Sequence, residues 1–174
     1  MIERLTGDDA DLIIEDRWPD RYNEDRIIAS ARHHRDVVAA ELSETAQPHL
    51  KNAHTEALDA NDGAFAEAVA TKTARHMHSA DQSALRHLAV AEHLEAFAAA
   101  VTTAKTRINT AVLTFTDEWA KAPQLAQANN WYQHDYNRYR TQLVETGRAS
   151  VSAALDELAA AHTTCSTVLQ AALD

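Results

Sequence analysis

The scarcity of residues that break helices is the strongest constraint on how this chain can fold. Its 174 residues contain three glycines and three prolines against 36 alanines. Sandwiches and barrels need turn signals about every ten positions, whereas alanine has the highest helix propensity of all residues. The sequence therefore predicts an all-α fold of about one domain's size and nearly excludes an all-β fold.

Glycines and prolines divide the first half of the chain into short helices. Gly7 precedes a short helix that should end before Trp18-Pro19, because a residue before proline avoids helical dihedral angles. A helix is expected from about residue 20 to 46, and Pro48 suits the first turn of the next helix, where its missing N–H would be unpaired anyway. The Asn61-Asp62-Gly63 turn signal predicts a break or bend in that next helix.

Two long helices are predicted in the second half. Ser79-Ala80-Asp81-Gln82 matches a capping box, and no glycine or proline follows until Pro123. A second long helix should run from about residue 130 to 172, with Gly147 as its weak point, since glycine costs about 1 kcal/mol relative to alanine in a helix. Both carry apolar residues at alternating spacings of three and four, as in a coiled coil: Leu94, Phe97, Val101, Ala104, Ile108, Ala111 and Phe115 on the first, and Val151, Leu155, Leu158, His162, Cys165, Leu169 and Ala172 on the second.

Two long helices with a short connection pack most simply side by side and antiparallel. We therefore predict one elongated helical bundle over residues 1–174, built on a long antiparallel hairpin at 81–174. Two shorter helices at 20–78 should pack against the hairpin, and 1–19 is an acidic segment with a short helix. Alanine seams bury little apolar area, so assembly with a second copy or with another helical protein would stabilise such a hairpin.

The charge balance argues against nucleic acids and membrane surfaces as partners. The chain has 16 basic and 26 acidic residues, which gives a net charge of −10. Nine acids and three arginines fall between Met1 and Asp25. Such a surface would repel phosphate groups and anionic lipid, so a protein partner or self-association is expected instead.

Neither the cysteine content nor the chain ends point to one compartment. Cys165 is the single cysteine, so no internal disulfide can form. No Sec-type signal is visible at Met1-Ile2-Glu3-Arg4, and the longest uncharged run, 158–173, is too short and too polar to span a bilayer. The predicted location is the cytoplasm, or outside the cell after export without a Sec signal.

Spacing excludes most local chemistry. The chain has ten histidines, but none lies three or four residues from another histidine or follows a glutamate at that distance, as helical metal ligands would. Cys165 lies on the apolar stripe near a helix C-terminus and is interpreted as a core residue. Three glycines cannot supply a phosphate-binding loop, and no small-molecule site is evident. We therefore predict no catalytic, cofactor-binding or metal-binding residues.

One segment, residues 129–140, has an unusual composition. Four of the chain's ten aromatic residues fall between Trp131 and Tyr139, and Trp131, Asp135 and Arg138 share one helical stripe. Tyrosine, tryptophan and arginine are enriched at protein–protein hot spots. The alternative is that these rings plug the turn end of the bundle. We predict a division of roles: Tyr132 and Tyr136 structural, Trp131, Asp135 and Arg138 available to a partner.

Residues 81–174 resemble the WXG family of small helical-hairpin proteins exported by type VII secretion. The similarity lies in two alanine-rich helices and in Trp119 at the turn, followed by Ala120-Lys121, where lysine stands in place of the family's glycine. The family's Tyr-x-x-x-Asp/Glu export signal is absent, since no tyrosine has an acid four residues on. The resemblance implies a non-enzymatic protein that pairs with another, and it adds Trp119 to the predicted contact residues.

The leading functional hypothesis is a non-enzymatic helical interaction protein, which the family resemblance would make a substrate or partner in type VII secretion. One alternative is a metal-binding or enzymatic bundle of ferritin-like shape, whose site is spread over several helices. The other is an acidic inhibitor or immunity-type protein that blocks a basic partner surface through Asp8, Asp9, Asp11, Glu15 and Asp16.

Overall fold

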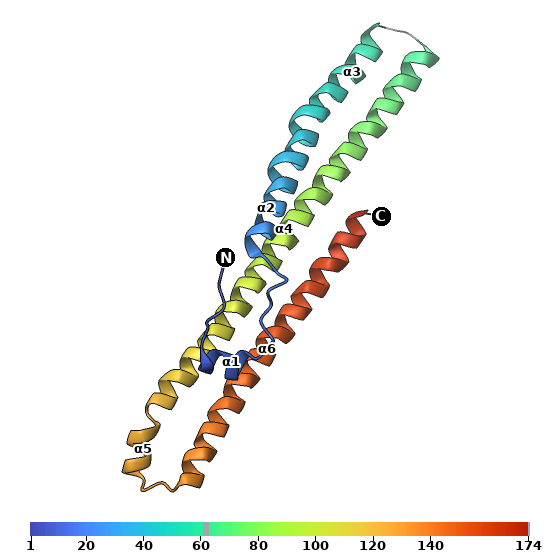
Figure 1. Ribbon diagram of the computed structural model, residues 1–174. Helices are drawn as coiled ribbons and strands as arrows, with labels where there is room; N and C mark the ends of the chain where they lie inside the picture. Colours follow the sequence, from blue (N-terminus) through green and yellow to red (C-terminus); the bar gives the residue numbers. More distant parts are fainter. Residues whose placement is uncertain (61–62, 174) are drawn as a thin grey trace. The chain divides into compact units, whose positions relative to one another are not determined.

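The computed structural model describes residues 1–60 and 63–173, and these residues form helices and no strand. The predicted all-α fold is confirmed (Figure 1). Six α-helices and two π-helical stretches follow one another along the chain: α1 (Asp8–Ile14), α2 (Glu24–Arg32), η1 (His33–Ala39), η2 (Glu41–Ala46), α3 (Gln47–Ala60), α4 (Ala64–Ala120), α5 (Ala122–Ala128) and α6 (Gln133–Leu173).

The chain divides into two compact units, which are described separately here. Unit 1 consists of Met1–Asp25 and Phe97–Thr164, and unit 2 consists of Arg26–Ala96 and Cys165–Asp174. Helices α4 and α6 each contribute one part to each unit.

Unit 1 is built on antiparallel parts of α4 and α6, connected through α5, with α1 lying against them (Figure 1). The predicted α4 seam is confirmed here, because its members from Phe97 to Phe115 are buried. The α6 side of the core includes Ala154, which the predicted stripe lacked. Large and small side chains alternate along this core, as close helix packing requires: Phe97, Val101, Ala104, Ile108, Ala111 and Phe115 on α4, Val151, Ala154 and Leu158 on α6, and Ile13 and Ile14 on α1.

Gly147 has a packing role that its helix propensity does not reveal. It is buried in α6, and a Cβ atom placed there would lie 2.9 Å from Ile13 Cδ1 and 3.2 Å from Ile13 Cγ2. Ile13 itself is fully buried. The residue that we predicted to be a weak point of the helix is therefore a position where α1 packs closely against α6.

The predicted short helix near the N-terminus is confirmed as α1, and polar contacts hold it in unit 1. Gly7 has φ 113° and its carbonyl accepts a hydrogen bond from Asp11 N at 2.9 Å. Arg148 on α6 donates to the Leu12 carbonyl at 3.1 Å, and Arg17 donates to Ser152 Oγ at 3.0 Å.

One helical run extends from Glu24 to Ala60 through α2, η1, η2 and α3, and it belongs to unit 2 from Arg26 on. Pro48 lies in the first turn of α3, as predicted, but α3 is not a separate helix, since Gln47 has helical dihedrals of −60° and −50° and joins η2 to α3. Proline cannot donate to the carbonyl four residues earlier, and the wide turns of η2 end just before it. The predicted break at Gly63 is confirmed by its φ of 90° and by the start of α4 at Ala64; Asn61 and Asp62 of the same turn signal lie outside the described residues.

The predicted helix start at Ser79 is wrong. Residues 79–82 lie in the interior of α4, which begins at Ala64 and contains 57 residues. A capping box competes with continued helix, and here the flanking sequence is rich in alanine and free of glycine and proline from Ala64 to Ala120. The predicted end near Pro123 holds, because α4 ends at Ala120 and the proline opens α5.

The core of unit 2 is made of small side chains. Among its described residues, no buried apolar side chain is larger than valine or cysteine. The larger apolar side chains Val37, Leu58, Phe65, Leu85 and Leu88 are exposed instead. The buried residues are Ala31, Ala39, Ala66, Ala70, Thr73, Ala84, Val90, Ala91 and Cys165.

Candidate functional site

The four residues predicted to contact a partner, Trp119, Trp131, Asp135 and Arg138, lie in unit 1 around the connection between α4 and α6. Trp119 is in the last turn of α4, Trp131 lies between α5 and α6, and Asp135 and Arg138 are in the first two turns of α6. Both tryptophans are half-buried and Arg138 is exposed. Much of the composition of this segment is explained by the way in which the two helices α5 and α6 are capped.

The end of α5 has the geometry of a Schellman cap. Asn130 has a φ of 53°, in the left-handed region that asparagine tolerates better than most residues. Trp131 N donates to the Ala126 carbonyl at 2.9 Å, and Asn129 N donates to the Leu125 carbonyl at 3.0 Å. These bonds satisfy carbonyls that a helix end leaves unpaired. The Asn129-Asn130 pair is the signal that could have predicted this cap from the sequence.

Asp135 caps the start of α6. Its Oδ2 atom accepts a hydrogen bond from Tyr132 N at 3.1 Å, and its Oδ1 atom lies 3.1 Å from His134 Nε2. A carboxylate in the first helical turn also interacts favourably with the helix dipole. The contacts of the Asp135 carboxylate are therefore local, and they stabilise the start of α6.

The aromatic rings of this segment pair with one another. The Trp119 and Tyr136 ring centroids are 4.7 Å apart, and those of Trp131 and Tyr139 are 5.2 Å apart. Such tilted contacts are favourable for aromatic pairs. The prediction that Tyr132 is structural is wrong, because its side chain is outside α6 and 75% exposed. The second long helix was predicted to start at about residue 130, but α6 begins at Gln133, after Tyr132.

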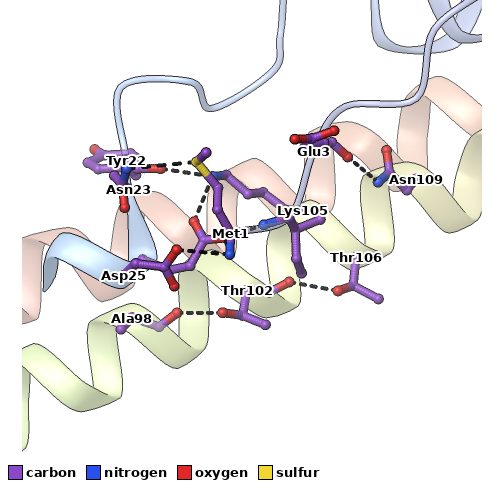
Figure 2. A network of polar contacts seen from close by, with 12 residues as sticks. Met1, Glu3, Tyr22, Asn23, Asp25, Ala98, Thr102, Lys105, Thr106 and Asn109 are labelled. Carbon is purple, nitrogen blue, oxygen red and sulfur yellow. Dashed lines mark hydrogen bonds and ion pairs between the residues drawn. The ribbon is translucent and has the colours of Figure 1, made fainter. Parts of the chain in front are cut away.

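A second polar cluster lies inside unit 1, where Lys105 of α4 meets Glu24 (Figure 2). Both residues are buried, with 2% and 4% of their surface exposed. Lys105 Nζ donates to Glu24 Oε2 and to the Tyr22 carbonyl, each at 2.8 Å. The N-terminal amine of Met1 lies 2.9 Å from Asp25 Oδ2, and Ile2 N donates to Glu24.

These hydrogen bonds keep Glu24 charged. Burial raises its pKa, but the hydrogen bonds from Lys105 and from backbone N–H groups have the larger combined effect and lower the pKa to about 2. The other carboxylate oxygen accepts from Ile2 N, so both oxygens of Glu24 have donors. Because its polar atoms are already paired, this cluster holds the N-terminal segment against α4 and offers no free group for catalysis.

Unit 2 contains a histidine pair that the spacing argument could not find, since the residues are 53 positions apart. His34 Nδ1 and His87 Nδ1 are 2.8 Å apart, and the ring centroids are 5.0 Å apart. The distance between the ring centroids is longer than the distance between the two Nδ1 atoms by about two ring radii. The two nitrogens therefore lie on the line between the centroids, and each points at the other ring. This is the geometry of one N–H···N hydrogen bond, which requires that at least one ring be neutral. Burial, followed by the charges of His87 and His33, lowers the pKa of His34.

Within the described residues, no three His, Cys, Asp or Glu side chains come together in a way that could hold a metal ion. The predicted placement of Cys165 in the core is confirmed, because the residue is buried, and burial raises the pKa of its thiol. None of the described helices is long and apolar enough to cross a membrane.

The feature that sequence reasoning missed is the outer side of α4 in unit 2. There a groove of about 790 Å³ lies between α3 and α4. Small residues of α4 and Leu58 of α3 are among its lining residues. The His54 imidazole at its edge lies 3.1 Å from the Ala70 carbonyl. The lining residues are His54, Leu58, Glu67, Ala70, Thr71, Ala74, Arg75 and His78.

The stripe of α4 that forms part of this groove continues to two exposed leucines. Leu85 is 59% exposed and Leu88 is 38% exposed. The six residues of the stripe, from Thr71 to Leu88, repeat at alternating spacings of three and four, and all six are exposed. That spacing was present in the sequence, but its first three residues lie before the helix start that we had predicted at Ser79. The outer stripe, as we call it, consists of Thr71, Ala74, His78, Asp81, Leu85 and Leu88.

Comparison with known proteins adds no relative from which a function could be taken. No family model, no curated protein and no solved structure matches this chain.

Proposed function

We propose that this chain is a non-enzymatic helical interaction protein and that unit 2 carries its contact surface. The observation that supports this proposal is the reversed distribution of side-chain size in unit 2. There alanines are buried while Leu58, Phe65 and Leu85 are exposed. Leucine and phenylalanine gain the most from leaving water, so an arrangement that leaves them outside is typical of a surface that a partner covers.

The same proposal assigns a smaller role to the aromatic segment of unit 1. Asp135 is occupied as a helix cap, and Trp119 and Trp131 each pack on a tyrosine. Arg138 and the two half-buried tryptophans stay predicted contact residues, but we rank them below the surface of unit 2. The association with type VII secretion, which rests on Trp119 and on the alanine-rich helices, likewise stays a prediction.

Site-specific photo-crosslinking in the native host tests the proposal. Leu85 in unit 2 is replaced by a benzophenone-bearing amino acid, and Leu113 in unit 1, which is 54% exposed on the same helix, serves as the matched control. We expect position 85 to give a discrete adduct, either with a second copy or with another protein, and position 113 to give much less. Equal labelling from both positions, or no adduct from position 85, would refute the proposal.

A further inference from the structure

The outer stripe of α4 has two unlike halves. Its first half, Thr71 and Ala74, borders the groove between α3 and α4, where side chains are small. Its second half, Leu85 and Leu88, presents large exposed apolar side chains. The small residues beside the groove and the large residues that could fill it therefore lie on the same side of one helix, about three turns apart.

The two halves are related by position as well as by size. Thr71 and Leu88, Ala74 and Leu85, and His78 and Asp81 are three pairs that share one midpoint, between Ser79 and Ala80. When two identical helices pack antiparallel with that midpoint on a two-fold axis, each residue faces the other member of its pair. Small residues then face leucines in the outer layers, and the leucines enter the groove beside Leu58.

The central layer is complementary in charge. In an antiparallel pair, each His78 imidazole faces the Asp81 carboxylate of the other copy. Asp81 is already positioned by Gln47, whose Nε2 donates to Asp81 Oδ1 at 2.5 Å, and its carboxylate keeps capacity for a further donor. A parallel pair would instead place histidine on histidine and aspartate on aspartate, and leucine on leucine with the groove unfilled.

We propose that two copies of this chain form an antiparallel homodimer through the outer stripe of α4, a pairing that rests on the proposed function of unit 2 as a contact surface. Spacings of three and four match the seam of two-stranded helical packing. The interface is isologous, as expected for a two-fold dimer, because the same stripe supplies both sides.

Disulfide trapping tests the register of this pairing. In a Cys165→Ala background, chains carrying Ala74→Cys are mixed with differently tagged chains carrying Leu85→Cys and oxidised gently. We expect the mixed 74–85 disulfide, and none from Ala74→Cys alone, since those two positions would be about 16 Å apart along the axis at 1.5 Å per residue. Trapping through 85–85 instead would indicate a parallel pair and overturn the proposal.

Sedimentation equilibrium tests the contact energetically. Leu85→Lys should raise the dimer dissociation constant at least about tenfold, because the change occurs twice in the interface at a hot-spot position. Leu113→Lys, a change of similar exposure outside the stripe, should leave the constant unchanged. Circular dichroism checks that both variants keep their helix content.

The outcomes separate this proposal from the broader one. A monomer at every concentration, with position 85 still crosslinking to a different protein in the host, overturns the homodimer and leaves the proposed function standing. A monomer that gives no adduct from position 85 overturns both.

Discussion

Units 1 and 2 are both made of antiparallel alanine-rich helices, yet they use their large apolar residues in opposite ways. Unit 1 buries Phe97, Ile108 and Phe115 together with Ile13 and Ile14 of α1. Unit 2 buries mostly alanine and leaves Leu58, Leu85, Leu88 and Phe65 exposed. Because burial of large side chains supplies most of the stability of a helical core, unit 1 should be the more stable by itself and unit 2 should gain more from a partner.

The two units also differ in the polar groups that join their helices. In unit 1, Lys105 and Glu24 form a buried ion pair. In unit 2, His34 and His87 share a hydrogen bond, and the more exposed Arg35 and Glu95 form an ion pair at 2.5 Å. A buried ion pair is costly to break by removing one partner, whereas a histidine pair responds to mild acid.

The largest expected effect is the loss of the buried cation in unit 1. Lys105→Met leaves the Glu24 carboxylate buried without its main donor and should cost about 3–5 kcal/mol of stability. Denaturant unfolding followed by tryptophan fluorescence measures this, because Trp18, Trp119 and Trp131 all lie in unit 1.

Lys72→Met is the matched control, since Lys72 is an exposed lysine on the same helix but in unit 2. It should change stability by less than about 0.5 kcal/mol. Adding Glu24→Gln to Lys105→Met should recover part of the loss by removing the unpaired charge. A cost below 1 kcal/mol for Lys105→Met would contradict the burial of this pair.

The second expected effect concerns the close approach of helices in unit 1. Ala104 is buried on the α4 seam, so Ala104→Leu should overpack the core and cost about 1–3 kcal/mol. Ala99 is exposed on the same helix, and Ala99→Leu should cost much less. Equal costs, measured by the same fluorescence-monitored unfolding, would mean that the seam of unit 1 is not where the structure has it.

Much of the fold of unit 1 could be predicted because its seam obeys one rule over many residues. The seam positions from Phe97 to Phe115 follow from helical periodicity, although Ala98, Lys105 and Val112 are buried beside them, and Pro123 marks the end of α4. Helix boundaries were harder to predict where two sequence signals, one for a helix end and one for continued helix, compete. Ser79-Gln82 is a valid capping pattern within a sequence that favours uninterrupted helix, and Pro48 is tolerated after a π-helical stretch.

Long-range pairs could not be predicted at all from one sequence. Nothing near His34 indicates that it meets His87, and nothing near Gly147 indicates that the Ile13 side chain packs against it so closely that a Cβ atom there would require a shift. The outer stripe was visible as a periodicity, but only the structure shows that no described element of unit 2 covers Leu85. Burial is a property of the whole fold, so exposed and core seams look alike in sequence.

The third expected effect is a pH dependence of unit 2 alone. Burial lowers the pKa of His34 below its ordinary value near 6.5, so the unfolded state binds protons more readily than the folded state. Stability is therefore full above about pH 6.5 and falls as the pH drops below it. His33 and His87 add repulsion when protonated, and the carboxylate of Glu95 in the same unit is paired with Arg35.

Hydrogen exchange of peptides from 26–60 and 64–96 between pH 7 and 5 measures this effect. Unit 1 should show little change over the same range, because its Glu24 stays charged until the pH falls well below 4.5 toward 2. His87→Gln should flatten the pH dependence of unit 2, while His76→Gln, at an exposed position of the same helix, should not. An equal pH response in both units would remove the histidine pair as its cause.

The smallest expected effect tests whether the exposure of a large side chain is enough by itself to identify a contact surface. Tyr132 in unit 1 is the most exposed large aromatic residue described, yet it lies at a helix cap and not on a repeating stripe. Tyr132→Ala should change stability by less than about 0.5 kcal/mol, since its backbone N–H can still donate to Asp135. It should also leave self-association unchanged, unlike Leu85→Lys.

Tyr136→Ala, which removes the ring packed on Trp119, should cost more than Tyr132→Ala by about 0.5–1.5 kcal/mol or above. If instead Tyr132→Ala weakens association as strongly as Leu85→Lys, then contact residues are spread over both units, and the reversed size distribution of unit 2 is not what selects the partner.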